Sequence, residues 1–156
     1  MATPQHERDR TLVISRITPS DLDAVIEIDY QITGTLRPQL WTDLLAARTA
    51  DDKPTFLVAR INAQVVGFVV GEVRRWEFGS PPCGWLFTIG VRPDYRLSKT
   101  GTQLLEALID RFRRQGVTTC RTMLHIDDHL LMSFFRSQGL TAGPFVELEK
   151  RLDDTP

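Results

Sequence analysis

The stretch YRLSKTGT, residues 95–102, has the residue types and spacing of a turn that binds an anion. It lies between an apolar run that ends at Val91 and an amphipathic stretch that starts at Gln103. Backbone N–H groups in the first turn of a helix have no intrahelical acceptor, and the helix dipole adds positive potential there. Such a helix start binds anions, so the spacing predicts a phosphate-bearing ligand at this turn.

The flanking segments predict the two elements that hold this turn. Residues 85–91 are rich in β-forming side chains and nearly continuously apolar, which favours a central strand buried on both faces. Pro93 ends that run. From Gln103 onward the apolar residues recur with the period of a helix, and Gly116 is its natural end. The sequence therefore predicts a strand, a tight turn and a helix.

Further elements are predicted around this unit. They are a strand over 11–17, helices over 22–32 and 39–47, a hairpin over 56–61 and 65–76, a strand over 118–125, a helix over 127–139 and a closing strand over 146–152. Thr18 followed by proline is a start signal for the first helix. Gly67 and Gly71 interrupt the second hairpin strand, which predicts a bulge or a close backbone approach.

Length and composition indicate one globular domain. With 156 residues, we expect a flexible N-terminus over 1–10 and a single domain over 11–153. Hydrophobic content of 42% and charged content of 25% are ordinary, and a net charge of −1 gives no bulk attraction to nucleic acid or anionic membrane. No basic excess or known motif favours a nucleic-acid-binding module.

The cysteines and the N-terminus indicate the compartment. Cys83 and Cys120 form no CxxC pair, so we interpret them as reduced core residues and expect no metal site. The first ten residues contain no apolar signal-peptide core, and no apolar run approaches the length that spans a membrane. The protein is therefore predicted to be cytoplasmic.

Two motifs carry a resemblance to a known family. The segment VRPDYRLSKTGTQLL resembles the acyl-CoA-binding motif of the GNAT N-acetyltransferases, with Arg96 and Gly101 at its two matching ends. The segment DDHLLMSFFRSQGL resembles the family's late helix motif, and the element order matches over nearly the whole chain. The resemblance implies an α/β fold with a mixed, mostly antiparallel sheet flanked by helices, and acetyl-CoA as cosubstrate. Its pyrophosphate would lie on Arg96, Leu97, Ser98, Lys99, Thr100, Gly101 and Thr102.

The resemblance also implies how the thioester is held. The backbone N–H of Ile89 would polarise the acetyl carbonyl, and that of Val91 would hold the pantetheine arm. Asp128 falls on the family's asparagine position near the pantetheine, and it is equally suited to cap a helix. Lys99 stands where the family has its first glycine. Its ammonium either contacts a phosphate or obstructs the backbone approach.

The proton-transfer groups depart from the family pattern. The usual general-base position falls on Trp85, which cannot accept a proton, so the candidates are Glu72 and His125. Pairing about the hairpin loop predicts Glu72 opposite Ile89 within about two residues; an ordinary surface carboxylate is the alternative. His125 is otherwise a surface or packed histidine. The family's proton-donating tyrosine is Phe135 here, so either the thiolate leaves unaided or the protein binds acyl-CoA without fast turnover.

These residues predict an enzyme that transfers acetyl from acetyl-CoA to a primary amine of a small molecule or peptide. The alternative is a CoA-binding or interaction protein on the same scaffold. Tyr30 and Trp41 are candidates for touching the acceptor by resemblance, with core packing as the favoured alternative. A homodimer is predicted from the aromatic residues around the hairpin loop, which are Trp76, Phe78 and Trp85.

Overall fold

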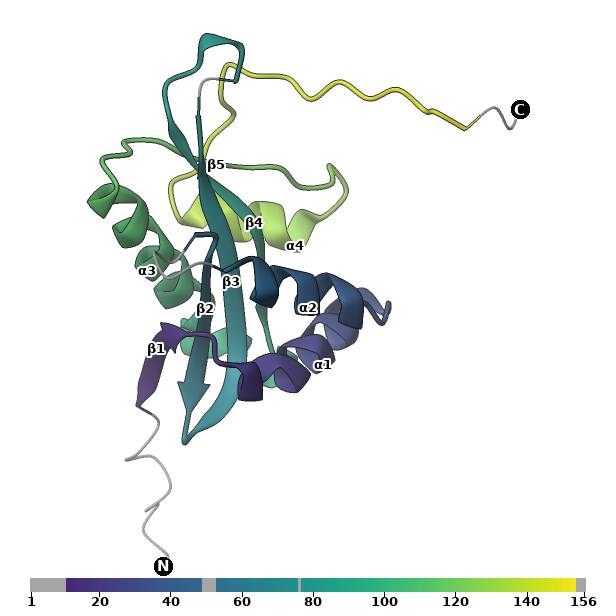
Figure 1. The fold of residues 1–156 in the computed structure, drawn as a ribbon, viewed down its shortest axis with the longest axis vertical. Coiled ribbons are helices and arrows are strands. Elements are labelled where there is room, and N and C mark those ends of the chain that lie inside the picture. Colours follow the sequence, from purple (N-terminus) through teal and green to yellow (C-terminus); the bar gives the residue numbers. More distant parts are fainter. Residues whose placement is uncertain (1–10, 49–52, 76, 154–156) are drawn as a thin grey trace, which may run out of the picture. The chain divides into compact units, whose positions relative to one another are not determined.

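The computed structural model describes residues 11–48, 53–75 and 77–153. Its strands are β1 (Leu12–Arg16), β2 (Thr55–Ile61), β3 (Gln64–Arg74), β4 (Cys83–Val91) and β5 (Cys120–Thr122). Its α-helices are α1 (Leu22–Thr33), α2 (Pro38–Ala47), α3 (Thr100–Arg114) and α4 (His129–Ser137), as Figure 1 shows. The chain divides into two compact units, one up to Met123 and one from Leu124 onward, and each is described by itself. The single domain over 11–153 stays a prediction, and residues 1–10 lie outside the described part.

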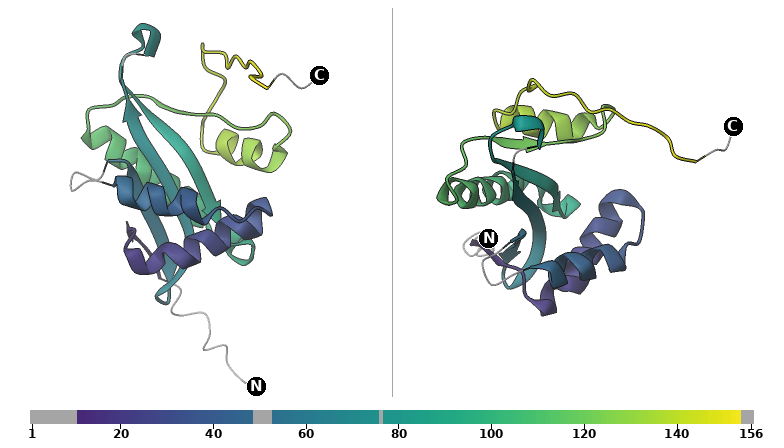
Figure 2. Two further views of the ribbon diagram at one scale, coloured as in Figure 1. Left: turned by 45° about the vertical axis from the view of Figure 1, so that its right-hand side comes forward. Right: turned by 45° about the horizontal axis from the view of Figure 1, so that its top comes forward.

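The first unit is a sheet with helices on both faces. The strands lie in the order β1-β2-β3-β4-β5, and all neighbours are antiparallel except the parallel pair β4 and β5. Helices α1 and α2 cover one face and α3 covers the other, which Figure 2 shows from two directions. The predicted mixed, mostly antiparallel sheet flanked by helices is confirmed.

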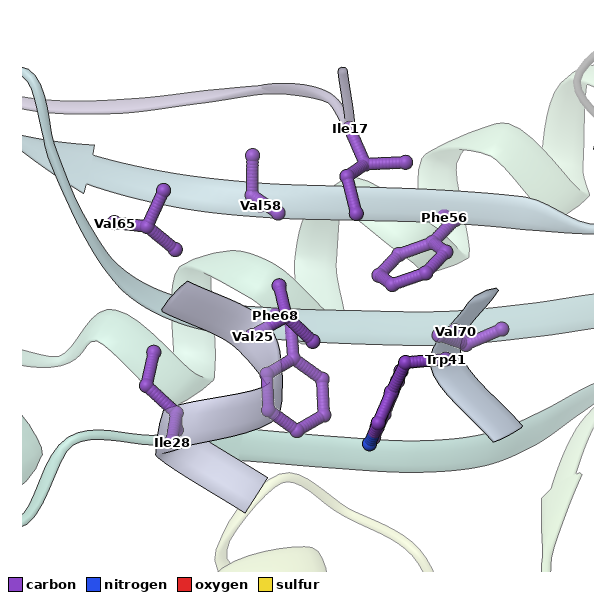
Figure 3. Packing of buried hydrophobic residues seen from close by; sticks show 9 residues of the cluster. All are labelled: Ile17, Val25, Ile28, Trp41, Phe56, Val58, Val65, Phe68 and Val70. Carbon is purple, nitrogen blue, oxygen red and sulfur yellow. The ribbon is translucent and has the colours of Figure 1, made fainter. Parts of the chain in front are cut away.

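The core between the sheet and the first two helices is built around Trp41 (Figure 3). This side chain is 0% exposed, and its ring centroid lies 4.8 Å from that of Phe68 and 5.7 Å from that of Phe56. Such tilted and edge-to-face pairs stabilise a core beyond the area they bury. Of the two interpretations of Trp41, core packing is therefore the one that the structure supports. Tyr30, in contrast, is exposed.

Glycines of β3 let α3 approach the other face closely. A Cβ at Gly67 would lie 2.9 Å from Gly90 O and 3.0 Å from Leu104 Cδ1, and one at Gly71 would lie 2.9 Å from Phe112 Cζ. Strand β3 also carries one extra residue, Val66, next to Gly67, because Ala59 pairs with Gly67 and Arg60 pairs with Val65. The predicted bulge and the predicted close approach are both confirmed. The glycines let α3 pack closely against β3, the strand that neighbours β4.

The hairpin register differs from the prediction. Glu72 pairs with Trp85, whereas Ile89 pairs with Val69. The chain reverses around Phe78 and Gly79, which have positive φ values of 47° and 76°. The turn therefore comes before the prolines and not at them. The bulge of β4 lies beyond this pair, between Leu86 and Thr88, so it does not change the partner of Glu72. The predicted pairing of Glu72 with Ile89 was therefore wrong.

Two further predictions about the sheet were wrong. Residues 146–152 form no strand, because their alternating apolar side chains favour a strand only where a neighbouring strand completes the hydrogen-bond ladder. The last strand of the sheet is instead the short β5. Strand β4 is also not buried on both faces, since Phe87 at its bulge is 40% exposed.

Candidate functional site

Strand β4 has one edge that is open over its second half. It pairs with β5 only from Gly84 to Leu86, where Thr122 Oγ1 donates to Leu86 O at 2.9 Å. Beyond Leu86, no strand of the described residues lies on this side. Arg92 donates its N–H toward β3, to Val66 O at 2.8 Å. Because N–H groups alternate in direction along a strand, those of Ile89 and Val91 point to the open edge.

The start of α3 lies beside the end of this strand. Gly67 pairs with Val91, and a Cβ at Gly67 would lie 3.4 Å from Thr100 Cγ2. Helix α3 begins at Thr100, three positions before the predicted Gln103, so Thr100, Gly101 and Thr102 form its first turn. The structure thus brings the predicted anion-binding turn and the predicted thioester strand together.

Lys99 is the N-cap of α3 and has an unusual backbone conformation for its type. Its φ of 58° lies in the left-handed region, and its side chain makes no capping hydrogen bond. Lys99 O accepts the first helical hydrogen bond, from Gln103 N at 3.1 Å. Ser98 Oγ lies 2.6 Å from Thr100 Oγ1 and steadies the turn. Both Lys99 and Arg96 are exposed, so their charges are available above the helix start.

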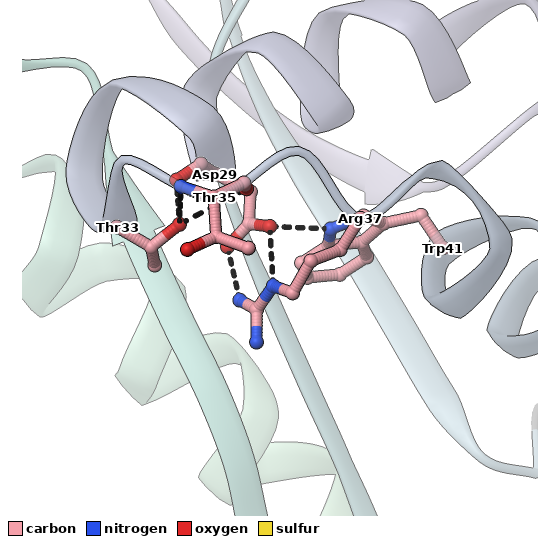
Figure 4. A network of polar contacts seen from close by, with 5 residues as sticks. All are labelled: Asp29, Thr33, Thr35, Arg37 and Trp41. Atoms are coloured by element: carbon pink, nitrogen blue, oxygen red, sulfur yellow. Dashed lines mark hydrogen bonds and ion pairs between the residues drawn. The ribbon is translucent and has the colours of Figure 1, made fainter.

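A polar clamp fixes the corner between α1 and α2 (Figure 4). The buried Asp29 accepts from Arg37 Nε at 3.0 Å, from Arg37 Nη2 at 2.5 Å and from Trp41 Nε1 at 2.9 Å. These hydrogen bonds raise the pKa of Arg37, against the opposing effect of burial. Asp29 on α1 thus accepts hydrogen bonds from Arg37 and from Trp41 on α2, and these contacts fix the geometry of the α1–α2 corner.

This corner lies over the open half of β4. A Cβ at Gly90 would lie 3.0 Å from Ile32 Cδ1 of α1 and 2.5 Å from Phe68 Cζ. The side chain of Ile32 is 40% exposed, and the nearby side chains of Leu36 and Leu40 are 64% and 41% exposed. The end of α1 therefore supplies an apolar wall beside the strand that is predicted to hold the thioester.

Glu72 belongs to a cluster of charges and aromatic rings that sequence reasoning missed. Arg74 Nε lies 3.6 Å from Glu72 Oε1 and 3.8 Å from Glu77 Oε1. The guanidinium carbon of Arg74 lies 4.3 Å from the ring centroid of Trp85 and 5.4 Å from that of Phe87. We call Glu72, Arg74, Glu77, Trp85 and Phe87 the Arg74 cage. Its signal in the sequence is charged residues two apart on one strand facing aromatic residues two apart on the next.

The predicted residues of the second unit have simpler local surroundings. Asp128 Oδ1 accepts from Leu131 N at 3.0 Å, so Asp128 does cap α4. His125 is exposed in the turn before α4, where its Nδ1 accepts from Asp127 N at 3.1 Å. Phe135 is buried, and its ring centroid lies 5.3 Å from that of Phe134.

Thiols, metals and membrane spans add little to the site. Burial raises the pKa of Cys120 to about 11, with a further contribution from Cys83, so its thiol is uncharged near neutral pH. Among the described residues, no group of three or more His, Cys, Asp and Glu side chains could hold a metal ion. Within the same part of the chain, no helix has the length and apolar character that crossing a membrane requires.

Comparison with known proteins gives consistent matches. Residues 22–140 match the family model described as the acetyltransferase (GNAT) family. An L-2,4-diaminobutyric acid acetyltransferase of Nocardia farcinica is 33% identical over 89 residues, which cover 57% of this chain and 45% of the relative. The match thus spans about half the length of that relative. An acetyltransferase of Pectobacterium atrosepticum is 25% identical over 135 residues, or 85% of this chain and 89% of the relative.

Solved structures show the same fold. An aminoglycoside N-acetyltransferase in complex with CoA superposes with a TM-score of 0.81 at 14% identity, covering 94% of this chain and 99% of the other. At this identity the likeness concerns the fold alone.

Proposed function

Because the chain belongs to the acetyltransferase (GNAT) family, we propose that it transfers an acetyl group from acetyl-CoA to a primary amine of a small molecule or peptide. One observation carries this proposal: the open edge of β4, with the N–H groups of Ile89 and Val91 turned toward it, adjoins the first turn of α3. Donors for a thioester carbonyl and for a pyrophosphate are thus adjacent in one unit.

The chain's own residues divide the binding of acetyl-CoA between them. The N–H of Ile89 polarises the acetyl carbonyl, so that the carbon accepts the amine lone pair, and the N–H of Val91 holds the pantetheine arm. The first turn of α3, from Thr100 to Thr102, holds the pyrophosphate with Leu97 and Ser98 before it. Lys99 and Arg96 add positive charge at the exposed rim.

Proton transfer rests on Glu72. It lies directly across from Trp85, which occupies the base position of the family motif, so its carboxylate is on the neighbouring strand at the same level. Trp85 is four residues from Ile89, or about 13 Å along a strand, so Glu72 accepts the proton through a chain of several water molecules. His125 is the second candidate, and its exposure gives it access to solvent protons.

The thiolate leaves without a protein donor, since the phenyl ring of Phe135 cannot protonate it. The leaving CoA thiolate takes its proton from water, and the amine nitrogen keeps the acetyl group as an amide. Asp128 is proposed to contact the pantetheine with the carboxylate oxygen that the helix cap does not use.

The setting of the reaction completes the proposal. The Nocardia relative is named for a diamino acid, which supports a small amine as acceptor. Two free cysteines support a cytoplasmic location. A homodimer through the hairpin loop is supported by the full exposure of Phe78; Trp76 lies outside the described residues, and Trp85 is partly covered by Arg74 within its own chain. A concentration-independent monomer mass in sedimentation would remove the dimer.

The proposed activity is tested by thiol release from acetyl-CoA against a panel of primary amines, beside calorimetric binding of CoA. We expect CoA binding and amine-dependent thiol release together. Binding without release on any amine would favour a CoA-binding protein on this scaffold. Absence of both would contradict the proposal.

A further inference from the structure

The Arg74 cage has the composition of a cation-binding site, and its occupant is part of the chain itself. Two aromatic faces and two carboxylates surround one guanidinium, at 4.3 and 5.4 Å from the ring centroids and 3.6 and 3.8 Å from the carboxylate oxygens. Aromatic faces attract cations within about 6 Å of their centroids, and more strongly where water is partly excluded. The geometry shows that a positive group fits here.

Arg74 fills this site loosely. Its Nε lies 3.6 and 3.8 Å from the two carboxylates, beyond hydrogen-bond distance, so Arg74 forms ion pairs with Glu72 and Glu77 but no side-chain hydrogen bond to either. Ion pairs of such length between partly exposed side chains contribute little to stability. A compact ammonium with three N–H donors can hydrogen-bond carboxylates that the guanidinium only approaches. A ligand cation can therefore displace Arg74 at small cost.

The position of the cage relates it to the acyl site. Phe87 follows Leu86, the last residue of β4 that pairs with β5, so the aromatic floor of the cage ends where the open edge begins. Along a strand, Phe87 and Trp85 lie about 7 and 13 Å from Ile89. Arg121, which pairs with Trp85 from β5, donates to Ser80 Oγ at 2.9 Å.

We propose that the Arg74 cage binds a second cationic group of the acceptor against Glu77, Trp85 and Phe87, while Glu72 keeps its role in proton transfer. The preferred substrates are then amines carrying another ammonium about 7 to 13 Å from the reacting nitrogen. Arg74 holds this place in the free protein and moves aside when the acceptor binds. This rests on the proposed function, and it makes Glu77 and Phe87 specificity-determining residues. The monoamine of equal length lacks the group that the cage recognises.

The test compares a long straight-chain diamine with the monoamine of equal length, in thiol-release kinetics at saturating acetyl-CoA. Glu77→Gln removes one carboxylate of the cage and should lower kcat/KM for the diamine by about two- to fivefold, with little change for the monoamine. Arg74→Ala empties the cage and should raise kcat/KM for the diamine by a similar factor. Glu106→Gln, on the exposed face of α3, is the matched control and should change neither.

Equilibrium binding of the diamine to the CoA complex, followed by calorimetry, separates this idea from the proposed function. Turnover of both amines with an unchanged diamine-to-monoamine ratio in Glu77→Gln and Arg74→Ala overturns the cage and leaves the acetyltransferase. If no amine is turned over, diamine binding that strengthens in Arg74→Ala and weakens in Glu77→Gln still supports the cage. Equal diamine binding by parent and both variants contradicts it.

Discussion

Gln103 donates its backbone N–H to the carbonyl oxygen of Lys99 at 3.1 Å, so α3 begins on a lysine whose own φ is 58°. A left-handed conformation costs a residue with a Cβ about 1 to 2 kcal/mol, and glycine avoids that cost. The family motif has glycine at this place. The backbone strain at Lys99 therefore lowers the stability of the protein. A function of the Lys99 side chain, such as a contact with phosphate, would offset that loss.

Lys99→Gly should raise the free energy of unfolding by about 0.5 kcal/mol, because the relief of strain exceeds the entropy that glycine loses on folding. Urea denaturation measures this. Lys99→Ala keeps the Cβ and removes the ammonium, so it serves as the control and should not gain stability. Both variants should bind CoA about fivefold more weakly, since the phosphate contact is lost. Tighter binding by the glycine variant would show that the lysine obstructs.

Gly101→Glu should abolish CoA binding while the protein remains folded. The substitution places bulk and negative charge in the first turn of α3, where the pyrophosphate is proposed to lie. Calorimetric titration with CoA gives the affinity, and circular dichroism checks the fold. Gly143→Glu is the matched control, because a Cβ there meets nothing within 4 Å. Unchanged affinity in a folded Gly101→Glu protein would place the CoA site elsewhere.

Asp29→Asn should destabilise the protein by about 3 kcal/mol, because Arg37 and Trp41 then lose their shared charged acceptor in a buried position. Asp43→Asn on α2 removes an exposed carboxylate and should cost under about 0.5 kcal/mol. Denaturant midpoints compare the two. The acceptor KM should also rise in Asp29→Asn while the acetyl-CoA KM stays constant, since the clamp fixes only the α1–α2 corner. Equal changes in the acceptor KM and the acetyl-CoA KM would show that the clamp does not act on the acceptor side alone.

Asp21 should make the protein sensitive to acid. Burial by itself raises the pKa of this carboxyl, but hydrogen bonds from the Thr18 backbone, from Arg60 and from the Thr18 hydroxyl together hold it below its usual value. A depressed pKa contributes stability that is present above the unfolded value of about 3.9 and is lost as the pH falls through the folded value. Asp21→Asn should therefore be less stable than the parent at neutral pH, and the difference should shrink below about pH 4. A pH-independent difference in urea midpoints would contradict this.

Glu72→Gln keeps the shape of the side chain and removes its basicity. Turnover should fall by about 10²- to 10⁴-fold with CoA affinity preserved. The measurements are kcat for parent and variant with one amine, and calorimetric binding of CoA. Near-parental turnover would leave His125 or direct attack by a neutral amine as the remaining routes.

The elements that sequence predicts well are those with a local periodic signal. The apolar period of α3, its end near Gly116 and the proline-marked start after Thr18 are encoded by neighbouring residues, so they follow from the sequence alone. The pairing register of Glu72 is not encoded by neighbouring residues, because it depends on where the eight-residue connection between Arg74 and Cys83 reverses direction. Likewise, the strand expected over 146–152 needed a partner that local propensity cannot supply.

The backbone arrangement of the candidate site follows from the sequence, whereas its side-chain contacts do not. The helix start and the strand around Ile89 are adjacent in sequence, so a turn necessarily brings them together. The Asp29 clamp and the Arg74 cage depend on rotamers and on pairing across strands. The spacing of charged and aromatic residues on two strands gives only an indirect signal for the cage, and it gives none for the Arg37 contacts, because both sets of contacts depend on tertiary packing.

Transfer of a labelled acetyl group tests the central claim most directly. The protein is incubated with acetyl-CoA carrying a ¹³C-acetyl group and a primary amine, and the products are followed by NMR and mass spectrometry. Our account predicts a ¹³C-labelled amide on the amine, formed in equal amount with free CoA and absent in the Gly101→Glu variant. An unlabelled amine across the panel, with CoA binding intact by calorimetry, would contradict it.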